Sequence, residues 1–102
     1  MPERDERGYL RDWRAWTPAI AEALARADGV ELGEDHWAVI GILREYYAEY
    51  EVAPPIRVLV RLVAERLGGS AASSRTLYRL FPEGPAKQAC RYAGLPRPVS
   101  CL

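Results

Sequence analysis

The chain has 102 residues, of which 49% are hydrophobic and 27% are charged, and its formal net charge is zero. This size and composition are typical of one folded domain that buries a core without disulfides or a metal. No run of about 18 apolar residues is present, which excludes a membrane-spanning helix. A chain of this size buries enough surface to be stable as a monomer, which we expect for the free protein. Because the N-terminal sequence MPERDERGYLRDW is too charged for a secretory signal, we expect a cytoplasmic protein.

The charges are distributed unevenly along the chain. Residues 1–53 hold 12 acidic and 6 basic side chains, whereas residues 54–102 hold 2 acidic and 8 basic ones. This polarity indicates that the C-terminal half meets anions or acidic partners. The alternative is that the charges only solvate exposed helix faces.

The first predicted elements lie before residue 30. Gly8-Tyr9-Leu10 is a candidate for a short N-terminal strand or β-hairpin. Thr17 and Pro18 are typical of a helix start, because threonine caps free N–H groups and proline lacks an N–H that would stay unpaired. Residues 19–27 are rich in helix formers and predict a first helix that ends near Gly29.

Two longer helices follow. The second begins at Glu34-Asp35, where acidic side chains complement the helix dipole. Its apolar residues recur at helical spacing as far as Tyr47 and form a wide stripe, which predicts the central and most buried helix. The third helix has Pro55 as its first residue, carries an apolar stripe over residues 56–67 and ends at Gly68-Gly69.

Residues 68–74 are small and polar and predict a flexible loop. Ser74 then caps a short fourth helix. The last helix begins at Pro85 and continues to about Tyr92, with Cys90 in its final turns.

The C-terminal segment cannot be helical, because Pro96 and Pro98 stand at alternate positions. The sequence therefore predicts a mainly α fold: a compact, helix-turn-helix-like bundle of about five short helices with a small N-terminal β-hairpin. Residues 1–94 form this domain. Residues 95–102 form a flexible arm that carries Cys101 and spans at most about 25 Å when extended.

The two cysteines, Cys90 and Cys101, offer the covalent chemistry of this sequence. In the cytosol thiols stay reduced, and a pair of them is more often catalytic or redox-active than structural. A disulfide between them would close a loop of ten residues, which suits a switch better than a structural bridge. The alternatives are a buried, inert Cys90 and an incidental thiol at the chain terminus for Cys101.

Cations surround these thiols in the sequence. Nearby positive charge lowers the pKa of a thiol, so we expect a thiolate or persulfide anion to be favoured here. From residue 75 onward the only acidic side chain is Glu83, and the basic ones are Arg75, Arg79, Lys87, Arg91 and Arg97.

The sequence gives little support for metal binding or for a phosphate-binding loop. His36 is the single histidine, and zinc normally takes four ligands from cysteine, histidine or carboxylates. No glycine-rich phosphate loop is present. We therefore expect neither a metal nor a cofactor, and interpret His36 and Trp37 as structural residues.

Several stretches of the sequence resemble one known family. They are Leu77–Cys90, which contains GPAKQA; the segment Ala93–Pro98 together with the penultimate Cys101; and the middle strings EDHW, REYY and PIRVL, which begin at Glu34, Arg44 and Pro55. This long and specific pattern is similar to the DsrC/TusE sulfur-relay family, and the resemblance covers nearly everything from Gly8 onward.

The resemblance implies a mostly helical domain with a small N-terminal β element and a C-terminal arm. It implies that Cys101 accepts sulfane sulfur as a persulfide and passes it on, with Cys90 as the resolving thiol. The protein would then be a co-substrate carrier of the sulfurtransferase type rather than a free-standing catalyst. The implied partners are relay proteins of the TusBCD or DsrEFH type, together with sulfite reductase or a tRNA-thiolating enzyme. The presence of Cys90 favours the DsrC side, in sulfite reduction or sulfur oxidation, over the TusE side.

Two hypotheses from other classes stay open. A DNA-binding regulator would use several short helices and the basic C-terminal half, although a DNA reader usually concentrates its cations on one helix and is basic overall. A structural subunit of a larger enzyme would keep its activity without either cysteine. The zero net charge and the spread of the arginines over several segments disfavour direct nucleic-acid binding.

Overall fold

The computed structural model describes residues 2–68 and 74–98. These residues contain five α-helices and one short 3-10 helix and no strand. In chain order the elements are η1 (Trp13–Ala15), α1 (Pro18–Ala27), α2 (Glu34–Tyr50), α3 (Ile56–Leu67), α4 (Ser74–Leu80) and α5 (Pro85–Tyr92). The predicted mainly helical fold of five short helices is therefore confirmed. No described helix is long and apolar enough to cross a membrane.

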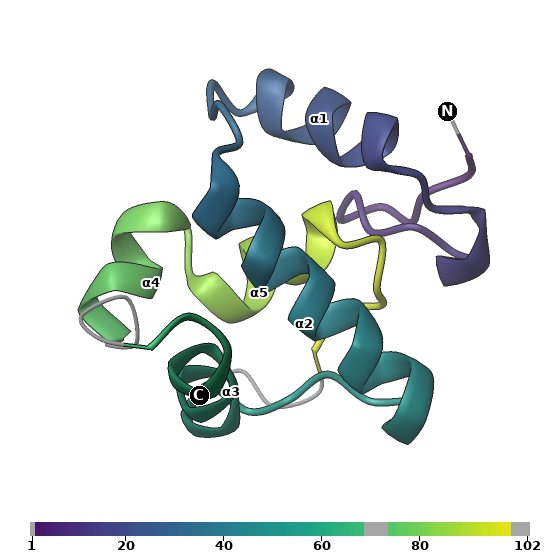
Figure 1. Cartoon of the computed structure of the whole chain (residues 1–102). Helices are drawn as coiled ribbons and strands as arrows, with labels where there is room; N and C mark the ends of the chain where they lie inside the picture. Colours follow the sequence, from purple (N-terminus) through teal and green to yellow (C-terminus); the bar gives the residue numbers. More distant parts are fainter. Residues whose placement is uncertain (1, 69–73, 99–102) are drawn as a thin grey trace.

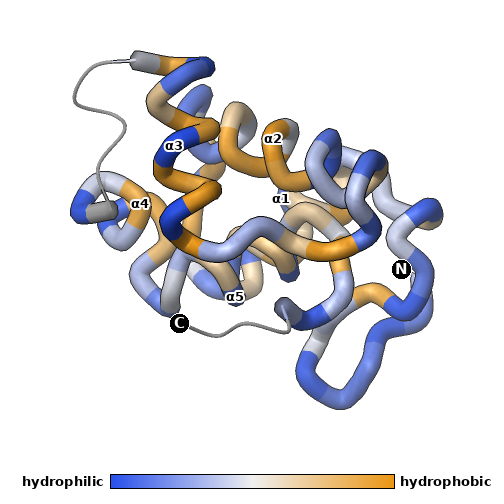
Figure 2. The backbone as a smooth tube through the Cα atoms, turned by 90° about the horizontal axis from the view of Figure 1, so that it is seen from below, coloured by the Kyte–Doolittle hydropathy of each residue, from blue (hydrophilic) through white to orange (hydrophobic). Residues whose placement is uncertain are grey.

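The helices pack around α5. This helix contacts α1, α2 and α4, while α3 packs against α2 and α4. Figure 1 shows α5 behind α2 and between α1 and α4. Along α3 the hydropathy alternates between hydrophobic and hydrophilic residues (Figure 2), as expected for a helix with one face in the core. Leu59 and Val63 supply that face and are at most 1% exposed.

The most buried helix is α5, and the prediction that the second helix would be the most buried is wrong. Five of the eight residues of α5 are buried, whereas only four of the seventeen residues of α2 are. The prediction failed because it ranked helices by apolar side chains alone. In α5 the buried residues include Gln88 and Tyr92, whose polar atoms have hydrogen-bond partners inside the protein, so their burial carries little penalty.

The predicted N-terminal β-hairpin is also wrong for the described residues. Arg4 and Leu10 form one isolated antiparallel bridge, and no strand extends from it. The Asp5 carboxylate accepts hydrogen bonds from the backbone N–H groups of Arg7 and Tyr9, so a side chain takes the donors that a longer ladder would need. Tyr9 and Leu10 are nevertheless buried, which fixes the segment to the core.

Proline and glycine mark most helix ends as predicted. Pro18 and Pro85 are the first residues of α1 and α5. Pro55 is the N-cap of α3 rather than its first residue, and Gly68 caps its C-terminal end. Of the predicted loop and arm, residues 69–73 and 99–102 lie outside the described residues, and with them Cys101.

Helix α5 ends in a Schellman motif at Gly94. The Leu95 N–H donates to the carbonyl of Cys90 at 3.0 Å, and the Gly94 N–H donates to the carbonyl of Arg91 at 3.2 Å. Gly94 adopts a left-handed conformation (φ +73°), and a Cβ built there would lie 2.5 Å from Cδ1 of Trp16. Glycine is therefore required at this position for two reasons, the backbone conformation and the close approach of an indole ring.

We predict that Gly94→Ala destabilises the protein more than Gly29→Ala. Gly29 ends α1 in the same motif (φ +75°), but a Cβ there meets nothing within 4 Å. Gly29→Ala should lower the free energy of unfolding by about 1 kcal/mol, for the left-handed backbone alone. Gly94→Ala should cost about 2 kcal/mol more, because of the overlap with Trp16. Urea denaturation measures both, and equal losses would contradict this account of Gly94.

Candidate functional site

Cys90 is a free thiol inside the protein, near the C-terminal end of α5. Its side chain is 1% exposed. Burial raises the pKa of the Cys90 thiol to about 12, because a thiolate without water is strongly disfavoured. Cys90 is therefore a neutral, covered thiol in this conformation and not an activated nucleophile.

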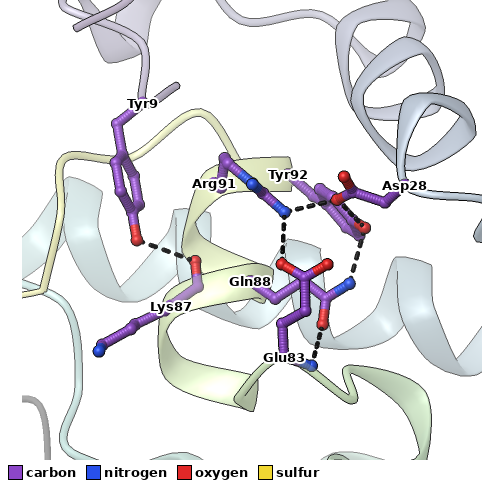
Figure 3. A network of polar contacts seen from close by, with 7 residues as sticks. All are labelled: Tyr9, Asp28, Glu83, Lys87, Gln88, Arg91 and Tyr92. Atoms are coloured by element: carbon purple, nitrogen blue, oxygen red, sulfur yellow. Dashed lines mark hydrogen bonds and ion pairs between the residues drawn. The ribbon is translucent and has the colours of Figure 1, made fainter. Parts of the chain in front are cut away.

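A chain of buried and partly buried hydrogen bonds connects α5 to Glu83 and to the C-terminal end of α1 (Figure 3). The Gln88 side chain accepts from the backbone N–H of Glu83 at 2.8 Å and donates to the Tyr92 hydroxyl at 2.8 Å. That hydroxyl donates in turn to the Asp28 carboxylate at 2.7 Å. Burial, together with the nearby Asp28 carboxylate, raises the pKa of Tyr92 to about 12. The phenol thus remains protonated and keeps its place as donor to α1's C-cap residue.

Arg91 belongs to this network and not to a free cationic surface. Its guanidinium forms ion pairs with Asp28 and with Glu83, the latter at 3.2 Å. It also lies 5.6 Å from the centre of the Tyr92 ring. Two carboxylates therefore offset the charge of Arg91.

The other side of α5's last turn is held by Trp16 and Arg44, which we call the Trp16–Arg44 pair. The Trp16 indole N–H donates to the carbonyl of Tyr92 at 2.7 Å, and the Arg44 guanidinium donates to the carbonyl of Ala93 at 2.7 Å. The guanidinium stacks 4.3 Å from the centre of a Trp16 ring and 5.2 Å from that of Trp13. Partial burial lowers the pKa of Arg44, and the rings and carbonyl offset this burial by cation–π and charge-assisted hydrogen bonding.

The start of the predicted arm is packed where it follows this pair. Leu95 is completely buried and Pro98 is buried as well, whereas Pro96 and Arg97 between them are exposed. The chain thus leaves α5 along the protein surface at least as far as residue 98.

The predicted cations do not form one cluster. Lys87 and Arg97 are exposed side chains that line a pocket of about 210 Å³ beside α5, together with Arg91. Arg75 and Arg79 are exposed residues of α4 and do not line this pocket. Two further lining residues from the N-terminal segment, Arg7 and Tyr9, were missed from sequence because no local pattern places them beside α5.

His36 connects two helices and contacts no cluster of metal ligands. Its Nδ1 accepts from the Gly33 N–H at 3.0 Å, so Nε2 carries the proton and donates to the Leu80 carbonyl at 3.0 Å. Its ring meets Phe81 edge-on. Among the described residues no group of three or more His, Cys, Asp or Glu is placed to hold a metal ion.

Sequence reasoning also missed the polar residues that fix α5. The signal for Arg44 was a lone cation within the apolar stripe of α2, which indicates a buried charge with a specific partner. For Asp28 and Trp16 no such signal exists, because their partners lie 64 and 76 residues away in sequence.

We predict that Cys90 reacts very slowly with iodoacetamide in the folded protein. A thiol pKa of about 12 in place of the ordinary 9.0 lowers the thiolate population at pH 8 by about a thousandfold. Mass spectrometry of Cys101→Ser, with and without urea, measures alkylation of Cys90 alone. Similar rates in the folded and unfolded protein would show that Cys90 is exposed.

Known proteins are similar to this chain in sequence and in structure. The sequence model of the family described as DsrC like protein matches residues 1–102. Sulfurtransferase TusE of Salmonella typhimurium is 48% identical over 98 residues, which cover 96% of this chain and 90% of that protein. The solution structure of DsrC from Allochromatium vinosum has a TM-score of 0.87 and 52% identity, over 96% of this chain and 88% of that one.

A crystal structure from Archaeoglobus fulgidus is also similar. It is the oxidized gamma-subunit of the dissimilatory sulfite reductase (DsrC), with a TM-score of 0.87 and 43% identity over 99% of this chain and 92% of that one. This chain therefore belongs to the DsrC-like family.

Proposed function

We propose that this chain is a sulfur carrier that receives sulfane sulfur as a persulfide on Cys101 and relays it to or from a partner enzyme. The proposal rests on one observation: the chain belongs to the DsrC-like family, and the proteins similar to it are named sulfurtransferase TusE and DsrC. The sequence also retains a thiol at the penultimate position, beyond the last helix. A carrier needs such a thiol to reach the active site of another protein.

The two thiols have different roles in this proposal. Cys90 is covered and its pKa is raised to about 12, which makes it a poor first acceptor of sulfur. Cys101 follows Pro98, the last described residue, by three positions, a span of at most about 10 Å. Cys101 therefore takes the sulfur, and Cys90 acts later as the resolving thiol.

The resolving step needs no reactant beyond the two cysteines and the bound sulfur. The Cys90 thiolate attacks Sγ of the Cys101 persulfide, the Cys90–Cys101 disulfide forms, the bond to the outer sulfur breaks and hydrosulfide leaves. Because Cys90 is covered in the described conformation, this step requires the residues over it to move. Leu95 is completely buried and its N–H donates to the Cys90 carbonyl, so the segment after α5 is anchored close to Cys90.

Two partner classes fit the proposal. The second thiol and the likeness to a subunit of the dissimilatory sulfite reductase favour a sulfite reductase or a sulfur-oxidation enzyme. The likeness to sulfurtransferase TusE supports the alternative, a relay that ends at a tRNA-thiolating enzyme. In both cases the protein is a cytoplasmic co-substrate that receives sulfur from relay proteins of the TusBCD or DsrEFH type.

We predict that a persulfide donor adds one sulfur to Cys101. The wild type and Cys90→Ser should each gain the mass of one sulfur, and reductant should remove it. Cys101→Ser should gain none, because its remaining thiol is the buried Cys90. Intact-mass spectrometry of the three proteins measures this directly.

The two cysteine variants distinguish which thiol takes the sulfur and whether the protein is a carrier at all. Loading of Cys101→Ser but not of Cys90→Ser would reverse the assignment of the two thiols. Absence of sulfur on all three proteins across several donors would refute the carrier function and favour a role as a structural subunit.

A further inference from the structure

The pocket beside α5 is lined by positively charged side chains, most of which form no ion pair within the described residues. Arg7, Lys87 and Arg97 line it and form no ion pair with a carboxylate of residues 2–68 or 74–98. The cation beside them, Arg91, is already offset by two carboxylates. One of these, Glu83, is the only acidic residue among the described residues that line the pocket.

These cations come together from three separate parts of the chain. Arg7 belongs to the N-terminal turn, Lys87 to α5 and Arg97 to the segment after Gly94. Neighbours of like charge repel each other and destabilise the fold slightly. Three exposed cations around one concavity of about 210 Å³ therefore form a surface suited to an anion.

Tyr9 places a polar hydroxyl in the wall of the pocket. Its ring is buried, and its hydroxyl reaches the Lys87 carbonyl in a long hydrogen bond of 3.4 Å (Figure 3). Burial raises the pKa of Tyr9, while the positive charges of Arg91 and Arg97 oppose this rise. The hydroxyl thus stays protonated and lies within the field of the pocket cations.

We propose that this pocket binds a small oxyanion with two negative charges. Lys87, Arg97 and Arg7 supply the charge, and their ammonium and guanidinium N–H groups supply the hydrogen bonds to the anion oxygens. This assignment rests on the proposed function for the choice of anion: a sulfur carrier that serves a sulfite-reducing enzyme meets sulfite. Phosphate offers the same recognition chemistry and is the other source to test.

Titration of the reduced protein with sulfite, sulfate and phosphate at constant ionic strength tests the site. Amide NMR shifts of Gly8, Tyr9 and Lys87 should move and saturate. Lys87→Gln and Arg97→Gln should each weaken binding by about threefold, the effect of one exposed charge. Arg75→Gln removes the same charge from α4 and should leave the affinity unchanged.

The outcomes are distinguishable. Shifts that never saturate with any anion, or equal weakening by Lys87→Gln and Arg75→Gln, would overturn the pocket as a site. Tighter binding of phosphate than of sulfite would overturn the sulfur assignment. Persulfide loading of Cys101 in the same variants reports on the proposed function separately, since it does not require an occupied pocket.

Discussion

The C-terminal end of a helix leaves carbonyl oxygens without partners in the helix, and α5 ends inside the protein rather than at its surface. Each carbonyl of its last turn therefore needs a donor from elsewhere. The Trp16–Arg44 pair serves the carbonyls of Tyr92 and Ala93, and the backbone of residues 94–95 serves the two before them. The indole can approach this closely only if residue 94 has no side chain, which connects the glycine to a tryptophan in η1's C-cap.

This constraint determines the environment of Cys90. With its last turn fixed from both sides, α5 holds Cys90 in the core, where burial raises its pKa to about 12. The same turn directs residues 95–98 along the protein, with Leu95 buried at its start. In the proposed carrier function, Cys90 is therefore the covered thiol on α5, and Cys101 is the thiol proposed to take the sulfur.

Local features of the sequence predicted most of the fold. Pro18 and Pro85 mark helix starts because proline at the first turn loses no hydrogen bond, and Gly68 and Gly94 mark ends because they take left-handed conformations. The central position of α5 was not predictable in this way. Its polar residues are buried by partners that tertiary packing brings close, and hydrophobic periodicity does not register such pairs.

The candidate site was predictable only in part, again because tertiary packing decides which side chains meet. The two cysteines were found because few residue types can carry sulfur. The number of cations was evident from the sequence, but their positions in space were not. Arg91 is paired with carboxylates and Arg75 lies on α4. Arg7, from the other end of the chain, lines the same pocket as Lys87. Charge counting along a sequence gives the sign of a surface, and the fold decides which charges remain unpaired.

Amide hydrogen exchange in the wild type and in Arg44→Met tests most directly whether the Trp16–Arg44 pair fixes the end of α5. Methionine keeps much of the packing of the arginine stem but cannot donate to the Ala93 carbonyl. The Leu95 amide should be protected in the wild type and exchange about tenfold faster in the variant, while the amides of Leu59 and Val63 in α3 change little. An unprotected Leu95 amide in the wild type, or equal acceleration throughout the chain, would contradict the account.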